Sequence, residues 1–281
     1  MTTITPTIPD IAAPERAPTT GAHFLTAAGQ TTRRTLLQFF RTPQVLMMGT
    51  ILGALFLFMF RYIFGGAIDP GGPVDYVDFL VPGFLVTTIL WTGMNAPAGV
   101  AEDAASGVFD RLRSLPIPRT SVMVGRSLAD TALVSWSMLV TIALSFAVGF
   151  RTHADAPSVV AALGLLLVAT YAFTWLFITI GMAAGNAQGA QGMATLVVVP
   201  LTFVSNAYVP GDSLPGWMQP VAERQPLTVL VNAVRSLMLG GTDAAGVGHS
   251  TGYWVGLSLA WCAGIFAVFG SLATARFART R

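Results

Sequence analysis

The side chains able to do acid–base, nucleophilic or metal chemistry are few and scattered. The 281 residues include 13 acidic residues, three histidines and one cysteine, Cys262. Glu102 and Asp103 form a carboxylate pair at the end of an apolar run, where helix capping or ion pairing with loop arginines is a simpler role than catalysis. The histidines share no metal-ligand spacing, and a lone cysteine makes no disulfide within the chain. This pattern predicts neither a catalytic centre nor a metal site.

The basic residues exclude two further kinds of chemistry. All 15 of them are arginine, because the chain has no lysine. A Walker A loop needs a lysine at the nucleotide phosphates, and a Schiff-base enzyme needs one as its nucleophile. We therefore expect no ATP-binding loop and no cofactor in this chain. A formal net charge of +2 is too small to favour nucleic acid as a partner.

The elements that carry these residues are apolar. Hydrophobic residues make up 53% of the chain and charged residues 10%, against about 25% charged residues in a soluble domain. Five runs lack charge, and the run 156–211 is broken by a Gly/Asn/Gln-rich turn at 181–192. Because a membrane helix needs about 20 apolar residues, the sequence predicts an all-α membrane protein with six spans, near 44–64, 80–101, 128–150, 158–181, 193–209 and 254–275.

The arginines set the expected orientation. With the N-terminus in the cytoplasm, eleven of the 15 arginines lie inside and four, Arg61, Arg151, Arg224 and Arg235, lie outside. The positive-inside rule favours this arrangement, which puts both termini in the cytoplasm.

The N-terminal region divides into two parts. Residues 1–21 are Thr/Pro-rich and predict a disordered cytoplasmic tail. Residues 22–42 show an amphipathic pattern, which predicts a helix in the inner membrane interface with its apolar stripe in lipid. A cytoplasmic extension of the first span is the alternative. The apolar stripe consists of Leu25, Ala28, Thr32, Leu36 and Phe39.

The segment 102–130 joins the second and third predicted spans and holds eight charges. Inside it, Val108, Leu112 and Leu115 follow helical spacing beside Phe109, and Pro116 ends the short helix. Such a helix is suited to docking in a groove of another protein. A solvated loop without a partner is the other interpretation.

The segment 206–243 carries too many charges for a span. Leu227, Leu230, Val231, Val234 and Leu237 form a helical stripe after Pro226. This predicts two short helices that dip into the membrane from outside, where protein or a water-filled cavity surrounds them. An external loop on the headgroups is the alternative, and Arg235 is expected to pair with Glu223 or with phosphates.

Two segments resemble one known family. Segment 102–119 resembles the cytoplasmic coupling segment of type-2 ABC exporter permeases. It contains an acidic residue, then Gly107, an apolar residue, a Leu and Pro116, and it is followed by Gly125-Arg126. A second set of pieces resembles that family's re-entrant region between spans five and six. These pieces are Tyr208-Val209-Pro210, Leu214-Pro215-Gly216-Trp217, Gln225-Pro226-Leu227-Thr228, Arg235-Ser236-Leu237 and Gly240. The resemblance covers nearly the whole chain, here residues 22–281 as the transmembrane domain, and is strongest to the daunorubicin-type drug-resistance permeases.

The resemblance implies a permease without enzymatic activity in a bacterial plasma membrane. Its partners would be a separate ABC ATPase, which binds the ATP, and a second permease, either another copy or a paralogue. It implies an ATPase-coupling set, Glu102, Gly107, Phe109, Leu112, Leu115 and Pro116, with Phe109 and Leu112 as the main anchors. It also implies an outer lid that contains Pro210, Pro215, Trp217, Pro226 and Arg235.

A second class of function stays open from the sequence. The chain could be a membrane-embedded enzyme or a regulatory or assembly subunit that transports nothing. Within the exporter interpretation, the nearly charge-free spans favour a hydrophobic or amphipathic substrate, such as a drug or lipid, over a polyanion.

Overall fold

The computed structural model describes residues 24–41, 53, 55–64, 75–113, 118–209 and 214–279. Every regular element in these ranges is helical. The elements are α1 (Phe24–Arg41), a π-helical turn η1 (Phe60–Phe64), α3 (Tyr76–Gly93), α4 (Ala96–Ala105), α5 (Val108–Arg113), α6 (Arg119–Ala147), α7 (Ala156–Ala183), α8 (Ala187–Phe203), α9 (Gln219–Arg224), α10 (Pro226–Met238), α11 (Thr242–Ala245) and α12 (Thr251–Arg279).

Four stretches are long and apolar enough to cross a membrane: Tyr76–Ala105, Thr120–Ala147, Ala156–Ala183 and Thr251–Phe277. They correspond to four of the six predicted spans and confirm a helical, multi-pass membrane protein. About half of the predicted span 44–64, namely residues 44–52 and 54, lies outside the described residues. The predicted span 193–209 corresponds to α8, which has 17 residues and contains Pro200. The count of six spans therefore stays a prediction.

Two predicted boundaries are wrong in an informative way. The third span was placed from 128, but α6 begins at Arg119 and contains Arg126 and Asp130. These residues are an ion pair at i, i+4 spacing, so their charges are compatible with a helix interior. The second span was placed from 80, whereas α3 begins at Tyr76 and includes Asp78, a buried residue that binds the turn before α7.

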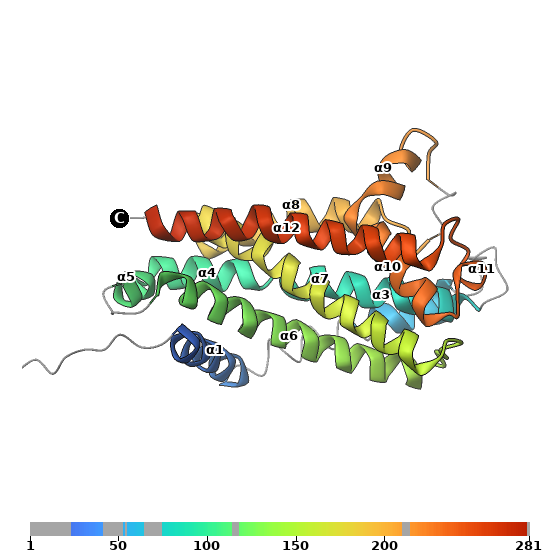
Figure 1. Ribbon diagram of the computed structural model, residues 1–281, viewed down its shortest axis with the longest axis horizontal. Coiled ribbons are helices and arrows are strands. Elements are labelled where there is room, and N and C mark those ends of the chain that lie inside the picture. Colours follow the sequence, from blue (N-terminus) through green and yellow to red (C-terminus); the bar gives the residue numbers. More distant parts are fainter. Residues whose placement is uncertain are drawn as a thin grey trace, which may run out of the picture.

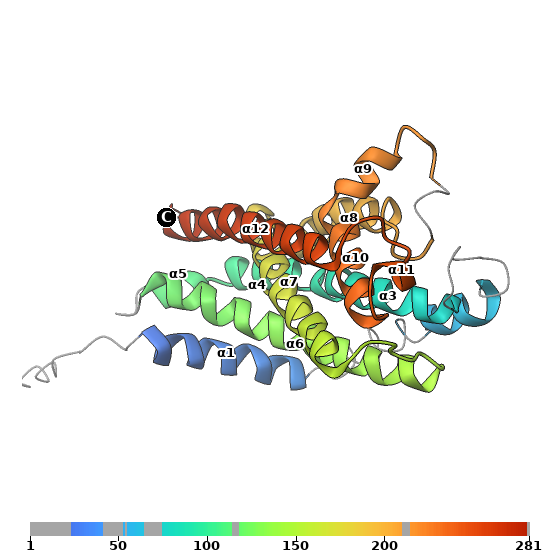
Figure 2. The same cartoon turned by 45° about the vertical axis from the view of Figure 1, so that its right-hand side comes forward.

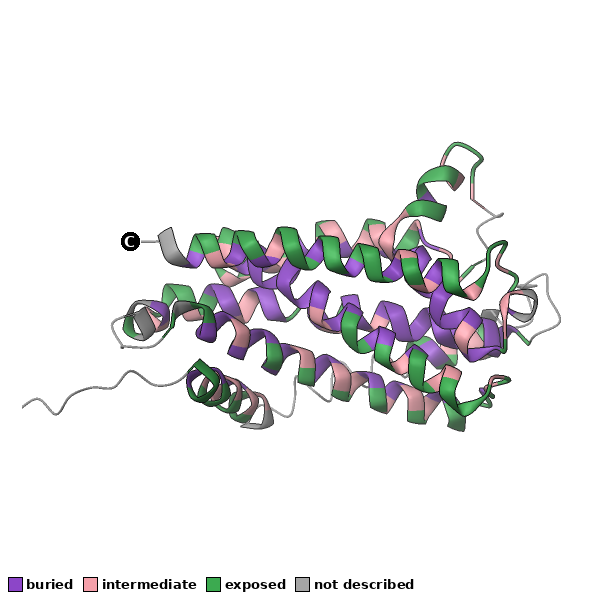
Figure 3. Cartoon of the chain, viewed as in Figure 1, coloured by how far each residue is buried: buried purple, intermediate pink, exposed green. Residues whose placement is uncertain are grey.

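The bundle is built around α7, which contacts α3, α4, α6 and α12. Buried residues line the inner faces of the bundle, whereas α12 has exposed residues on one side along its length (Figure 3). Close approach depends on glycine at crossing points. A Cβ atom on Gly181 would lie 2.6 Å from the carbonyl oxygen of Pro97, and one on Gly125 would lie 2.5 Å from that of Ala28. Small residues of this kind let membrane helices pack backbone to backbone.

The bundle is elongated and its two ends differ (Figures 1 and 2). The short helix α5 and the C-terminal end of α12 lie at one end, which we call the α5 end. The helices α9, α10 and α11 lie at the other, which we call the α10 end. The orientation predicted from the arginines would put the α5 end in the cytoplasm.

The helix α1 matches the predicted range but not the predicted environment of its apolar stripe. It packs along α6, and Ala27, Ala28 and Thr35 are buried. Thr32 Oγ1 donates to the carbonyl oxygen of Gly125 at 2.9 Å. Ala28 and Thr32 therefore face protein rather than lipid, because small side chains let α1 approach Gly125. Leu25, by contrast, is 81% exposed.

Candidate functional site

The α5 end is shaped by a tight turn between α4 and α5. Gly107 has φ +71°, a left-handed conformation that favours glycine. The backbone N–H of Ser106 donates to the carbonyl oxygen of Glu102 and closes the last turn of α4. A short helix, α5, is therefore present at Val108–Arg113, within the segment that the sequence predicts for coupling. The side chain of Leu112, and Leu115 and Pro116 altogether, lie outside the described part of the chain.

Phe109 does not have the role expected of a docking anchor. Its side chain is buried and meets the ring of Phe277 edge-on, with centroids 5.5 Å apart. Val122, Met123 and Trp175 belong to the same apolar cluster. Phe109 therefore attaches α5 to α6, α7 and α12, which leaves it unavailable for contact with another protein in this conformation.

An ionic network joins α1, α4 and α6 beside this turn. Arg34 Nη2 donates to Asp103 Oδ1 at 2.9 Å, and Arg126 Nη1 donates to Asp103 Oδ2 at 2.8 Å. Arg126 Nε also donates to Asp130 Oδ2 at 2.9 Å. The predicted ion pairing of Asp103 with arginines is confirmed, but the arginines belong to α1 and α6. The spacing of Arg126 and Asp130 was the available sequence signal.

At the α10 end, the proline-rich segment lies partly on the surface. Trp217 is 78% exposed, and Pro215 is exposed too. Pro226 is the first residue of α10, and Pro210 lies outside the described residues. The backbone N–H of Met218 donates to the carbonyl oxygen of Pro215 at 2.8 Å, which makes this turn compact. Trp217 therefore projects away from the spans.

Arg235 is fully buried in α10 and donates to backbone carbonyl groups, whereas the sequence predicts pairing with Glu223 or with phosphates. Its Nε donates to the carbonyl oxygen of Phe79 at 3.2 Å, and its Nη2 donates to that of Asn206 at 3.1 Å. The guanidinium also lies 3.7 Å from the centroid of the Phe79 ring.

Further hydrogen bonds hold the turn 205–208 to the same place. Tyr208 Oη donates to Thr87 Oγ1 at 2.9 Å, and Tyr76 Oη donates to the carbonyl oxygen of Tyr208 at 3.2 Å. Asn206 Nδ2 donates to Asn232 Oδ1 at 2.7 Å. Arg235 and these side chains thus join α3, α10 and the turn.

Asp78 adds a third connection at this end. Its Oδ1 accepts from the backbone N–H of Arg151 at 3.0 Å, and its Oδ2 lies 2.9 Å from His153 Nε2. The backbone N–H of His153 donates to the carbonyl oxygen of Met238 at 3.2 Å. The turn between α6 and α7 is therefore attached to the start of α3 and to the end of α10.

The described helices include four that are long and apolar enough to cross a membrane, and this defines the class as a multi-pass membrane protein. The chain belongs to the ABC-2 type transporter family, which it matches over residues 27–239. The resemblance inferred from segments 102–119 and 208–237 is thereby confirmed.

Individual relatives are named as transport permeases. The chain is 31% identical over 240 residues to the daunorubicin resistance ABC transporter permease protein DrrB1 of Streptomyces coeruleorubidus, covering 85% of this chain and 81% of that protein. It is 23% identical over 241 residues to the probable doxorubicin resistance ABC transporter permease protein DrrC of Mycobacterium tuberculosis, covering 84% and 83%. It is 27% identical over 207 residues to the inner membrane transport permease YadH of Escherichia coli, covering 71% and 77%.

Proposed function

We propose that the chain is the membrane-spanning permease subunit of an ATP-driven exporter. It moves a hydrophobic or amphipathic substrate, a drug or a lipid, out of a bacterial cell. The family supports the transport role, and the names of two relatives support drug resistance. One structural observation carries the proposal: α5, held by Phe109, lies at the end of the bundle opposite the packed α10 segment. Force applied to α5 would thus act across the length of the bundle.

The driving ATPase is a separate polypeptide that binds α5. Leu112, Leu115 and Pro116 provide the contact, Gly107 permits the turn before it, and Glu102 accepts the hydrogen bond that ends α4. Phe109 fixes α5 on the bundle and so transmits its movement. No ATP-binding loop is available on this chain, because it has no lysine.

The complete permease has six spans, with the first near 44–64 and the fifth formed by α8. Both termini are cytoplasmic, and α1 lies at the inner interface against α6. The helices α9 and α10 enter the membrane from outside as a lid that includes Pro210, Pro215, Trp217, Pro226 and Arg235. The substrate pathway lies between this chain and a second permease, either a copy or a paralogue.

Reconstitution tests this proposal directly. The chain is co-expressed with a candidate ABC ATPase from the same genome, and the purified complex is placed in liposomes that contain daunorubicin as a candidate substrate. We expect ATP-dependent movement of the drug, and Leu112→Asp should abolish it together with recovery of the ATPase on an affinity-tagged permease. Leu112→Met, which keeps an apolar side chain of similar volume, is the matched control. Normal ATPase recovery and transport by Leu112→Asp would refute the coupling role.

A further inference from the structure

The side of α1 that faces away from α6 carries a row of exposed residues. Ala27, Ala28 and Thr35 are buried on the opposite side, where the helix packs on α6. Residues four positions apart lie next to one another on the surface of a helix, and the exposed row has this spacing. It consists of Leu25, Gly29, Arg33 and Leu37. Leu25 is 81% exposed and Leu37 is 42% exposed, so Arg33 lies between exposed apolar residues.

The positive charge of Arg33 is separate from the ionic network of the α5 end. In that network, Arg34 and Arg126 are paired with Asp103 and Asp130, so that two cations face two carboxylates. Arg33 follows Arg34 by less than a turn on the other side of α1, where its side chain is exposed. The network therefore does not use the charge of Arg33, which is accessible to an anion from outside the protein.

The position of α1 in the bundle is that of a helix at a membrane surface. Thr32 Oγ1 donates to the carbonyl oxygen of Gly125, and Arg34 binds Asp103 near the end of α4, so α1 lies at the level of the charged residues of the α5 end. The helix is foreshortened in Figure 1 and extended in Figure 2, so it runs obliquely across the long axis of the bundle. Helices that lie in the membrane interface place apolar side chains in the acyl region and cations at the headgroups.

We propose that the exposed row of α1 binds an acidic phospholipid of the cytoplasmic leaflet. Arg33 donates to the phosphate of the headgroup, and Leu25 and Leu37 contact the acyl chains. An acidic lipid is favoured over a zwitterionic one, since each arginine near the surface adds to the attraction of anionic lipid. A lipid is favoured over a free phosphate, which would leave both leucines in water. The inference rests on the proposed function, whose orientation puts this surface at the inner leaflet.

Lipid binding to the full-length permease tests the proposal. The protein is purified in a mild detergent and titrated with phosphatidylglycerol or with phosphatidylcholine, and native mass spectrometry counts the lipids bound to each chain. Phosphatidylglycerol carries a net negative charge, whereas phosphatidylcholine is zwitterionic. We expect the most tightly bound lipid to be phosphatidylglycerol, with an affinity about fivefold higher than that of phosphatidylcholine. An excess of inorganic phosphate should not displace it.

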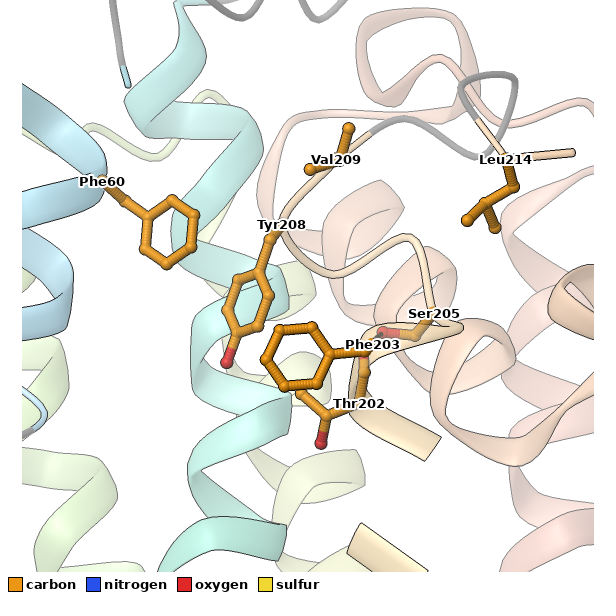
Figure 4. Close-up of a pocket in the computed structure, with 7 residues that line it drawn as sticks. All are labelled: Phe60, Thr202, Phe203, Ser205, Tyr208, Val209 and Leu214. Atoms are coloured by element: carbon orange, nitrogen blue, oxygen red, sulfur yellow. Dashed lines mark hydrogen bonds between the residues drawn. The ribbon is translucent and has the colours of Figure 1, made fainter. Parts of the chain in front are cut away.

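Two pairs of variants locate the binding. Arg33→Gln should weaken phosphatidylglycerol about fivefold, the value of one arginine at an anionic surface, and leave phosphatidylcholine unchanged. Its control is Arg224→Gln, which removes an exposed arginine from α9 at the other end of the bundle and should have no effect. Leu25→Ala should weaken both lipids, because it removes an apolar contact. Its control is Phe203→Ala, which removes a 64% exposed ring from the recess at the α10 end (Figure 4) and should not change this binding.

The outcomes distinguish this lipid site from the exporter function. Equal affinity of the wild type for the two lipids, or equal binding of phosphatidylglycerol by Arg33→Gln and Arg224→Gln, would overturn the site even where ATP-driven transport is measured. Displacement of the lipid by inorganic phosphate would assign Arg33 to a soluble anion and overturn the role of the membrane. Loss of the ATPase from Arg33→Gln with unchanged lipid binding would assign the row to a protein partner and overturn the site too. Lipid binding with the expected dependence on these residues, but no ATP-driven transport of any substrate, would support the site and contradict the exporter function.

Discussion

Asp103 is the acceptor shared by Arg34 and Arg126, so one carboxylate joins α4 to both α1 and α6. Arg126 has 6% of its side chain exposed and Arg34 has 38%. Arg126→Gln should therefore lower the free energy of unfolding by about 3–5 kcal/mol, because it leaves the buried carboxylate of Asp130 without a cation. Arg34→Gln should lower it by less than about 1 kcal/mol.

Chemical unfolding in detergent measures these two changes, and hydrogen exchange shows where they act. Arg34→Gln should speed amide exchange in α1. The exposed neighbour Arg33 makes no ion pair among the described residues, so Arg33→Gln is the matched control. Similar exchange in the two variants would mean that Asp103 does not hold α1.

Arg235 gives a second prediction at the residue scale. Because its guanidinium connects Phe79 and Asn206, Arg235→Ala should loosen α10 and speed amide exchange at 227–238. Arg235→Lys should restore only part of the protection, since an ammonium group cannot stack flat on Phe79 while it reaches two carbonyl oxygens. The measurement is hydrogen exchange in nanodiscs.

Trp217→Ala is the contrasting variant for Arg235, because this side chain is 78% exposed. Its effect on the free energy of unfolding should stay within about 0.5 kcal/mol. Rapid exchange at 227–238 in the wild type would contradict a packed lid. A large effect of Trp217→Ala on that exchange would contradict the position of the side chain in the structure.

Some residue roles could be read from the sequence, and others could not. Gly107 and Pro226 lie at the turn and the helix start that glycine and proline favour. The partners of Arg235 are backbone carbonyl groups and a ring from α3 and the turn after α8, and no spacing pattern encodes such long-range contacts. The burial of Phe109 was missed for a similar reason, because Phe277 is its partner from the far end of the chain.

Phe109 and Leu112 both belong to α5, but we expect their substitutions to have different effects on the protein. Phe109→Ala removes a buried ring and should cost about 3–5 kcal/mol locally. It should release α5 from the bundle, which faster amide exchange at 108–113 would show, while the ATPase is still recovered on the permease. Leu112→Asp should lose the ATPase and leave exchange in α12 unchanged.

A double variant checks the contact itself. If Phe109 and Phe277 hold each other, the effects of Phe109→Ala and Phe277→Ala on stability should be less than additive when combined. Additive effects would show that the two rings act independently, and α5 would then be held by other contacts.

Among the elements, apolar continuity was the most reliable guide. The prediction 158–181 for α7 agrees with Ala156–Ala183 to within two residues at each end. The agreement is close because the residues of α7 are apolar on all sides, so the charge-free run marks the helix clearly. The predicted start of α6 is too late because Arg126 and Asp130, counted as separate charges, indicate a loop. In the structure they form an ion pair within the helix. The environment of α1 was misjudged because an amphipathic pattern does not say whether lipid or a neighbouring helix covers the apolar side.

For the whole molecule, the orientation can be tested with single cysteines in a Cys262→Ala background. Ala105 is the last residue of α4, just before α5, and Gly216 lies just before α9; both are exposed. The helices α5 and α9 lie at opposite ends of the bundle (Figure 1). In intact cells, a membrane-impermeant maleimide should label Gly216→Cys and should label Ala105→Cys only after the cells are opened. The reverse pattern would place α5 outside, where no cytoplasmic ATPase could reach it.

The buried cation of Arg235 also constrains how the chain is made. An arginine placed alone in the bilayer interior is unfavourable, and its two hydrogen-bond acceptors belong to Phe79 and Asn206. Both acceptors precede Arg235 in the chain. We therefore expect α10 to reach its final position by packing onto α3 and the turn after α8, rather than by inserting on its own.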